Sequence, residues 1–176
     1  QKAQAGNQSG ADLFISIHRN SSPESNQYSG VESLVYSENG IKKELAENIN
    51  RELTKAGFHD LGIRERPGLV VLRRTKMPAV LVEVGFINTE EDNQTLDQNF
   101  DQTAQAIADG ILMTLRENGM LPGGPSESGS VSSQQEPEQP LYQSSRETQP
   151  PVRYRVQTGA FRQRENAERL HYRLLQ

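Results

Sequence analysis

The stretch that decides the fold is LFISI at residues 13–17, which His18 follows directly. A short, nearly continuous run of apolar and β-forming residues is typical of a strand buried on both faces, as in parallel sheets. AVLVEV at residues 79–84 has the same character, and a segment with helical periodicity lies between the two runs. Because strands alternate with helices, the sequence predicts an α/β fold with a mostly parallel sheet flanked by helices.

Further elements follow on either side of these runs. GVESLVYS at residues 30–37 predicts another strand, and LVVL at 69–72 is a further candidate for a buried strand. HDLGIRERPG at 59–68 has the composition of a loop. A helix from about 39 to 56 is predicted by four apolar residues at four-residue spacing, namely Ile41, Leu45, Ile49 and Leu53.

A long helix is predicted after the second buried strand, ending at Asn118 and Gly119. Thr89 and Asp92 have the spacing of a capping box, with Asp in place of the usual Glu or Gln. The expected buried stripe recurs at helical spacing and consists of Phe100, Ala104, Ile107, Ile111 and Leu115.

Composition narrows the possible functions. The chain has a formal net charge of −4, a pI of about 5.5 and no cysteine. Because no basic run is present, nucleic acid is not an expected partner. The lack of cysteine excludes disulfides and thiolate metal sites. No apolar run reaches the roughly 18 residues of a membrane span. The chain starts with Gln1 and ends within an apparent helix, so we expect it to be part of a longer protein.

The composition also predicts three segments. Residues 1–119 carry the α/β pattern, whereas residues 120–151 are rich in Pro, Ser, Gln and Glu and have almost nothing to bury. Such a segment does not offset its own ordering entropy, so we expect a disordered linker there. A strand-like and a helix-like pattern resume in residues 152–176, which predicts the start of a second, small α/β module.

Two residues stand out as candidates for chemistry. His18 ends one buried strand, and Glu83 is a carboxylate within another, so a parallel sheet would bring both to the same edge. A neutral imidazole suits zinc, and a desolvated carboxylate suits proton transfer. Alternatively, His18 is structural, and Glu83 faces solvent or an arginine such as Arg73. His59 and His171 are poorly placed as further ligands, so the residues alone leave the metal site incomplete.

ADLFISIHRN at 11–20 and MPAVLVEVGFIN at 77–88 resemble two motifs of the zinc-dependent N-acetylmuramoyl-L-alanine amidases of bacterial cell walls. The resemblance covers about residues 1–118. It implies a zinc cofactor, His18 as the last of three zinc ligands and Glu83 as the catalytic carboxylate. The family's other ligands, a His and a Glu, belong to a segment that would precede Gln1. We therefore expect this chain alone to bind zinc weakly and to hydrolyse little.

The resemblance also implies the substrate, which is the amide between N-acetylmuramic acid and L-alanine in peptidoglycan. The protein would then act outside the cytoplasm, as a monomer. Arg19, where many members have Ala, is a candidate substrate contact, as are Asn20 and Arg73. The segment after Gly85-Phe86 departs from the common I-S-N-P pattern. YRVQTGAFRQRENAERLHYRL at 154–174 resembles the beginning of a SPOR domain, a module that binds peptidoglycan glycan strands.

Two other functions stay open at this point. The first is a non-catalytic, wall-binding or regulatory protein that keeps the amidase fold. The second is a nucleotide-binding α/β domain, although Gly62, Gly68 and Gly85 form no phosphate-binding pattern. Zinc content and release of stem peptides would distinguish the first from an amidase, and thermal stabilisation by nucleotides would support the second.

Overall fold

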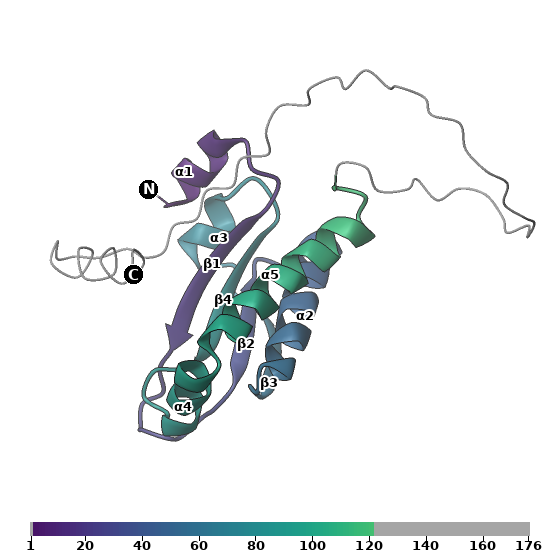
Figure 1. The fold of residues 1–176 in the computed structure, drawn as a ribbon. Helices are drawn as coiled ribbons and strands as arrows, with labels where there is room; N and C mark the ends of the chain where they lie inside the picture. The colour runs from purple at the N-terminus through teal and green to yellow at the C-terminus, as the bar shows by residue number, and fades with distance from the viewer. Residues whose placement is uncertain (1, 122–176) are drawn as a thin grey trace, which may run out of the picture. The chain divides into compact units, whose positions relative to one another are not determined.

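The computed structural model describes residues 2–121, and the expected linker and SPOR-like segment lie outside these described residues. The elements are shown in Figure 1. They are, in chain order, α1 (Lys2–Ser9), β1 (Phe14–Asn20), β2 (Val31–Val35), α2 (Gly40–Lys55), β3 (Asp60–Glu65), α3 (Val70–Arg74), β4 (Ala79–Phe86), α4 (Glu90–Gln98) and α5 (Phe100–Glu117).

The four strands form one mixed sheet in the order β1-β4-β2-β3. β1 pairs with β4 in parallel, and β2 pairs with β3 in parallel, with α2 as the connection between the latter two. The central pair, β2 and β4, runs antiparallel. The predicted α/β class with a helix-flanked sheet is therefore confirmed, and one of its three strand pairings is antiparallel.

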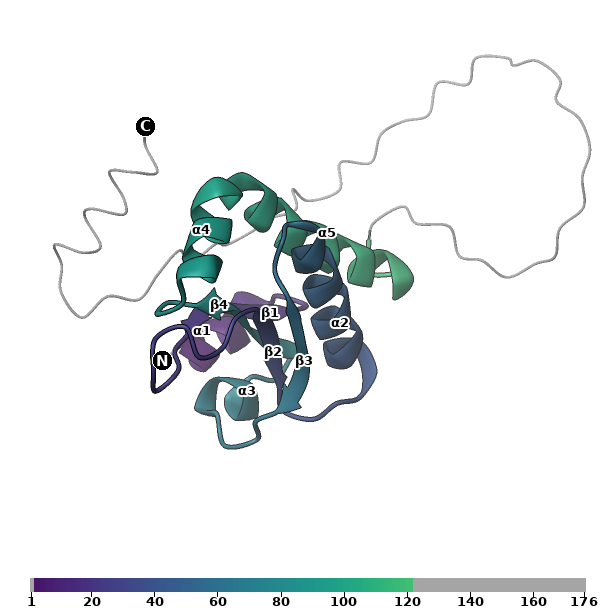
Figure 2. The same ribbon diagram turned by 90° about the horizontal axis from the view of Figure 1, so that it is seen from below.

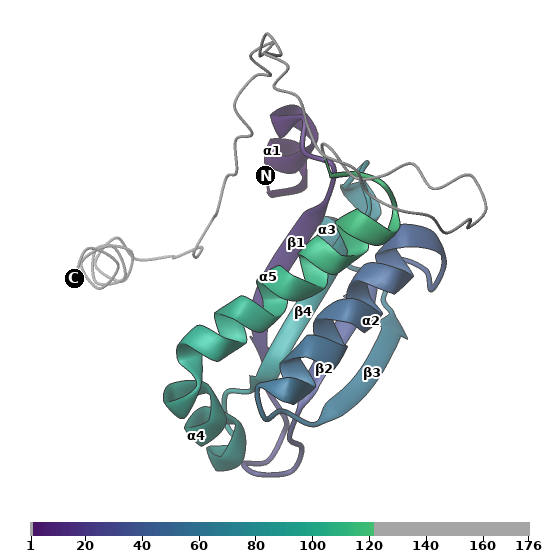
Figure 3. The same ribbon diagram turned by 45° about the vertical axis from the view of Figure 1, so that its right-hand side comes forward.

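Helices cover both faces of the sheet. α2 and α5 lie side by side over one face (Figure 3), where β4 contributes Val80, Val82 and Val84 to the larger core. α3 packs on the opposite face, where Leu72 meets a smaller cluster that includes Leu81. Figure 2 shows these layers from below, with α3 and α2 on opposite sides of the strands. Because side chains alternate along a strand, the two faces of β4 support two different apolar layers.

Two sequence predictions are wrong between residues 59 and 72. LVVL at residues 69–72 leads into a short helix, α3, in which Leu72 is the buried residue. The prediction of a strand failed because a short apolar run does not distinguish a strand from a turn of helix. The expected loop contains β3, an edge strand with mostly exposed side chains. β3 is held by backbone pairing to β2 and by the Asn50 amide, which donates to Gly62 O at 2.9 Å.

The predicted long helix is divided into α4 and α5 at Asn99. Phe100 and Ala104 do not face the core, and Phe100 is 63% exposed. Ile107 of the predicted stripe is buried and Ile111 packs against the core, but the other buried residues of α5 are small, namely Thr103, Ala106, Gly110 and Thr114. A Cβ at Gly110 would stand 2.7 Å from the Ile49 Cα. The helices therefore approach through small residues, and the largest apolar side chains misled the prediction.

The predicted capping box is also absent. Thr89 is the residue before α4, but its hydroxyl donates to Tyr28 O at 2.5 Å and not to its own helix. Asp92 is 1% exposed and accepts from Gly30 N and Phe86 N. Both side chains join segments that are distant in sequence. Among helices in residues 2–121, none has the length and hydrophobicity for crossing a bilayer.

Candidate active site

His18 and Glu83 face each other across the β1–β4 pair. They are Cα partners in the parallel register, near the C-terminal end of both strands. Residues paired directly across two strands point to the same side of the sheet, and for these two it is the side covered by α3. The sequence-based expectation that the two residues meet at one edge of the sheet is therefore fulfilled in the backbone register.

His18 is held by a neighbour on its own strand. Its Nε2 lies 3.0 Å from the hydroxyl of Ser16, which is buried two residues earlier on the same face. Burial, and secondarily the charge of Lys2, lower the pKa of the His18 imidazole. The lowered pKa favours the neutral ring, which is the form that binds a metal ion.

Glu83 is half-buried, and its Oε2 atom has no hydrogen-bond partner among the described residues although that atom is buried. Burial is the larger cause that raises the pKa of this carboxyl, and the nearby carboxylate of Glu32 is the smaller. A desolvated carboxylate oxygen without a donor is costly in a core. It is, however, the arrangement expected of a group that exchanges protons with a bound molecule.

Glu32 continues the line of charged groups across the sheet. It is the Cα partner of Glu83 on β2, and its buried carboxylate forms an ion pair with Arg64 of β3. We use the term polar row for His18, Glu83, Glu32 and Arg64, one residue from each strand. The sequence analysis did not single out Glu32. The signal was available, since Glu32, like Glu83, is an acidic residue within a strand of buried residues.

The three candidate substrate contacts lie apart from this pair. Arg19 follows His18 and therefore points to the other face, where its guanidinium donates to Phe86 O at 3.0 Å and to Asn93 Oδ1 at 2.7 Å. Asn20 Oδ1 accepts from Ser21 N at 2.8 Å. Arg73 is exposed on α3. Their role in substrate binding stays a prediction, because their described contacts hold protein segments.

Asp92 fixes the loop ends around the site. Its carboxylate accepts from Phe86 N at 2.6 Å and Gly30 N at 3.0 Å, and the Ser29 hydroxyl donates to it at 2.9 Å. One side chain thus ties the C-terminal end of β4 to the segment entering β2. Gly85 allows this approach, because a Cβ there would lie 2.8 Å from Asp92 Cβ. The sequence analysis assigned Asp92 to a helix cap.

The donor atoms suit part of a zinc site. His18 offers an imidazole nitrogen. The Oε2 atom of Glu83, which has no hydrogen-bond partner among the described residues, lies on the same face of the sheet, as expected of a carboxylate that works beside a metal. Within residues 2–121, no group of three His, Cys, Asp or Glu residues is arranged to hold a metal ion. His59 pairs with Glu91 at 3.2 Å on the surface, and His171 lies outside the described residues.

Known proteins are similar to this chain in sequence and in fold. The sequence model of the N-acetylmuramoyl-L-alanine amidase family matches residues 1–113. The amidase LytC of Bacillus subtilis is 37% identical over 111 residues, which are 60% of this chain and 22% of LytC. The germination-specific N-acetylmuramoyl-L-alanine amidase of the same bacterium is 30% identical over 125 residues, 69% of this chain and 52% of the relative.

A solved structure agrees with the sequence comparison. The crystal structure of an N-acetylmuramoyl-L-alanine amidase from Clostridium difficile 630 superposes with a TM-score of 0.60 at 33% identity, covering 65% of this chain and 63% of that one. This chain thus spans less than two thirds of the length of each of these three proteins. The family match extends over more than half of the chain and includes both His18 and Glu83. The chain therefore belongs to the N-acetylmuramoyl-L-alanine amidase family.

Proposed function

We propose that the protein hydrolyses the amide between N-acetylmuramic acid and L-alanine in peptidoglycan, with zinc as cofactor and Glu83 as general base and acid. The observation that carries this proposal is the pairing of His18 with Glu83 across two parallel strands, where Glu83 has a buried oxygen without a hydrogen-bond partner among the described residues. Membership of the amidase family supports the reaction. The peptidoglycan substrate in turn supports a location outside the cytoplasm.

His18 would hold the metal together with the His and Glu that the family resemblance assigns to an earlier segment. When bound, zinc supplies a Lewis acid that polarises the scissile carbonyl and lowers the pKa of water. Ser16 contributes on the protein side, because its hydrogen bond to Nε2 restrains the rotation of the His18 ring. Such a partner of a metal-binding histidine orients the ring and selects its tautomer.

Glu83 moves the proton. Its carboxylate takes a proton from the attacking water as the water oxygen bonds to the carbonyl carbon. It then returns that proton to the nitrogen of L-alanine as the carbon–nitrogen bond breaks, so that the amine leaves neutral. A raised pKa favours both steps, because it brings the Glu83 carboxyl closer to the pH at which the enzyme works.

The substitution Glu83→Gln in the full-length native protein tests the assignment. The amide keeps the size of the side chain but accepts no proton, so release of stem peptides from purified peptidoglycan should fall by on the order of 10²–10⁴-fold. Zinc content, measured by mass spectrometry, should stay unchanged. The matched control is Glu47→Gln on the exposed side of α2, which should leave the rate unchanged.

Two results would reject the proposal in different ways. If Glu83→Gln keeps a rate within about threefold of wild type, Glu83 is not the proton carrier. If the wild-type protein binds peptidoglycan but releases no stem peptides with zinc present, the protein is a non-catalytic wall-binding member of the family.

The SPOR-like resemblance of residues 152–176 supports a second contact with glycan strands, which would raise the local substrate concentration for the amidase domain.

A further inference from the structure

Glu32 has no part in the reaction described above, yet it is the carboxylate directly opposite Glu83. The two residues are Cα partners in the antiparallel pairing of β2 with β4. Their side chains therefore leave the sheet on the same face, where like charges repel each other. Because Glu32 is only 7% exposed, water compensates little of this repulsion. The placement is costly unless a cation neutralises Glu32.

The cation is Arg64 on β3, whose guanidinium forms an ion pair with the Glu32 carboxylate. Arg64 is the Cα partner of Leu34, two residues after Glu32, so its side chain reaches diagonally across the sheet to form this pair. More than half of the Arg64 side chain is exposed, whereas the Glu32 side chain is buried. Glu32 is thus the fixed member of the pair, and Arg64 is the member with room to move.

Glu83 lies within reach of the same guanidinium. Adjacent strands are about 4.8 Å apart, so β3 and β4 are separated by roughly 10 Å with β2 between them. An extended arginine and a glutamate side chain together span this distance. Glu83 Oε2 has no hydrogen-bond partner among the described residues, and a desolvated carboxylate oxygen accepts strongly from an arginine N–H. Glu32 therefore stands between Arg64 and the proposed proton carrier.

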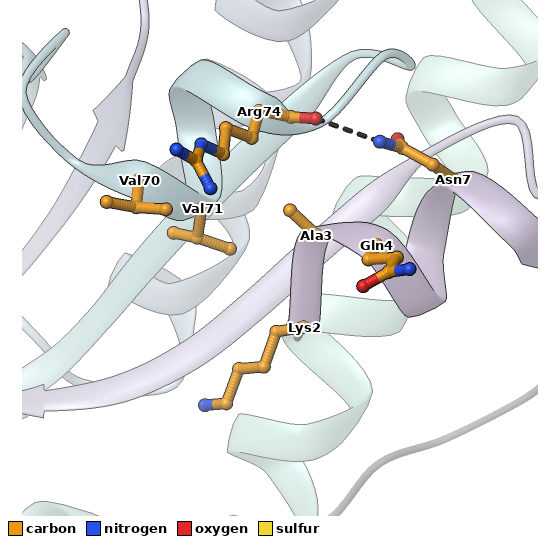
Figure 4. A pocket seen from close by; sticks show the side chains of 7 residues that line it. All are labelled: Lys2, Ala3, Gln4, Asn7, Val70, Val71 and Arg74. Carbon is orange, nitrogen blue, oxygen red and sulfur yellow. Dashed lines mark hydrogen bonds between the residues drawn. The ribbon is translucent and has the colours of Figure 1, made fainter.

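Two other cationic side chains, Lys2 and Arg74, lie elsewhere. They line a groove between α1 and α3, and Figure 4 shows both of them in this groove. The groove is at the N-terminal ends of β1 and β4 (Figure 1), whereas Glu83 lies near the C-terminal end of β4. Arg64 is thus the cation that the polar row itself directs towards Glu83.

We propose that Glu32 is a positioning residue of the amidase, which holds Arg64 in an ion pair and so keeps the Glu83 carboxylate without a cationic partner. This inference rests on the proposed function, because it concerns the group assigned there as proton carrier. A carboxylate oxygen that accepts from a guanidinium is less available to accept a proton from water. Loss of Glu32 should thus impair Glu83 through Arg64, and removal of Arg64 as well should restore it.

The test compares the release of stem peptides by variants of the full-length native protein. Glu32→Gln should lower the rate by on the order of tenfold, because Arg64 then pairs with Glu83. Glu32→Gln combined with Arg64→Gln should return the rate to within about threefold of wild type. Glu32→Asp keeps the charge that holds Arg64, so its rate should also stay near that of wild type.

The matched control is Glu52→Gln on α2. Glu52 is also 7% exposed and is also paired with a more exposed cation, Lys55, but it lies outside the polar row. Its loss therefore reproduces the general cost of breaking a half-buried ion pair. Glu52→Gln should lower Tm and leave the rate unchanged.

Thermal melts of the chain at pH 7 give a second readout that does not depend on activity. In the wild-type background, Glu83→Gln should raise Tm, because it removes a desolvated charge without a partner. In the Glu32→Gln background, the same substitution should lower Tm, because Glu83 has then gained Arg64 as a partner. A gain in Tm in both backgrounds would overturn the inference.

The activity outcomes separate Glu32 from the proposed function. A double variant as slow as Glu32→Gln would overturn the inference, because Glu32 would then act by its own charge and not through Arg64. A wild-type rate for Glu32→Gln would overturn it as well. If Glu32→Gln does not fold, Glu32→Met takes its place, since it has a similar volume and equally releases Arg64. If the wild-type protein releases no stem peptides, the proposed function fails, and the melts still test whether Arg64 moves to Glu83.

Discussion

The substitution Asp92→Ala should destabilise the fold far more than Asp92→Asn, although both remove the same charge. Asp92 is 1% exposed and lies where α4, the end of β4 and the entry to β2 meet. Its Oδ2 accepts from Phe86 N, its Oδ1 accepts from the Ser29 hydroxyl, and Gly30 N donates to both oxygens. The two substitutions therefore differ in which buried donors they leave without an acceptor.

The magnitude follows from these contacts. Alanine leaves two buried backbone N–H groups unpaired, and each costs about 1–3 kcal/mol, so we expect Asp92→Ala to lower the free energy of unfolding by about 4 kcal/mol. Asparagine can present its oxygen to both N–H groups and its amide to the Ser29 hydroxyl, which accepts as readily as it donates. Only the charge assistance is lost, so Asp92→Asn should cost about 1 kcal/mol.

Urea unfolding of the chain at pH 7, followed by circular dichroism, measures both values. The matched control is Asp97→Ala, an exposed aspartate on the same helix, which should change the free energy of unfolding by less than about 0.5 kcal/mol. The reasoning fails if Asp92→Ala costs under about 1 kcal/mol, or if Asp92→Asn costs as much as alanine. Either result would mean that the carboxylate is not the acceptor that satisfies these buried donors.

The other predictions concern single contacts. Because burial raises the pKa of Glu83, the folded state binds a proton at this carboxyl more tightly than the unfolded state does. The free energy of unfolding therefore falls as the pH rises from below the ordinary glutamate pKa through the folded pKa. Glu83→Gln should thus be more stable than wild type at pH 7 in thermal melts, and this gain should vanish at low pH. Gly110→Ala should cost about 1–3 kcal/mol, because its Cβ meets the Ile49 backbone, whereas Gly68→Ala has open space and should cost little in the same melts. Arg19→Ala should cost about 1–2 kcal/mol through two lost hydrogen bonds, one to the last residue of β4 and one to α4, and an unchanged Tm with a raised KM would instead favour a role in substrate binding.

The fold could be predicted where burial is reflected in the pattern of apolar residues. Both mostly apolar runs became the paired strands β1 and β4, and their register brings His18 opposite Glu83. The pattern failed where stability comes from the backbone or from small residues. β3 is an edge strand with only two apolar residues, Leu61 and Ile63, and Leu61 is exposed, so its apolar pattern is weak. α5 packs through Gly110 and its small neighbours, which carry no hydrophobic signal.

The site could be predicted only in part, for a related reason. A carboxylate within a buried strand is visible in the sequence, and this signal found Glu83 but was not applied to Glu32. The partners that give each residue its environment are distant in sequence. Asp92 meets Gly30 only after the chain has folded, and Arg19 looked like a neighbour of the metal because it follows His18. Strand alternation instead directs its guanidinium to the C-terminal end of β4 and to α4.

The antiparallel pairing of β2 with β4 determines which charged residue lies next to Glu83 in the polar row. Because β2 runs antiparallel to β4, Glu32 is placed directly opposite Glu83 and not at the far end of its strand. Arg64 neutralises Glu32 from the outer side. Glu83 is the next carboxylate in the row, and its Oε2 has no such partner among the described residues. A fold selected for stability alone would pair or replace that oxygen, so the row concentrates its electrostatic cost at the one carboxylate that faces His18.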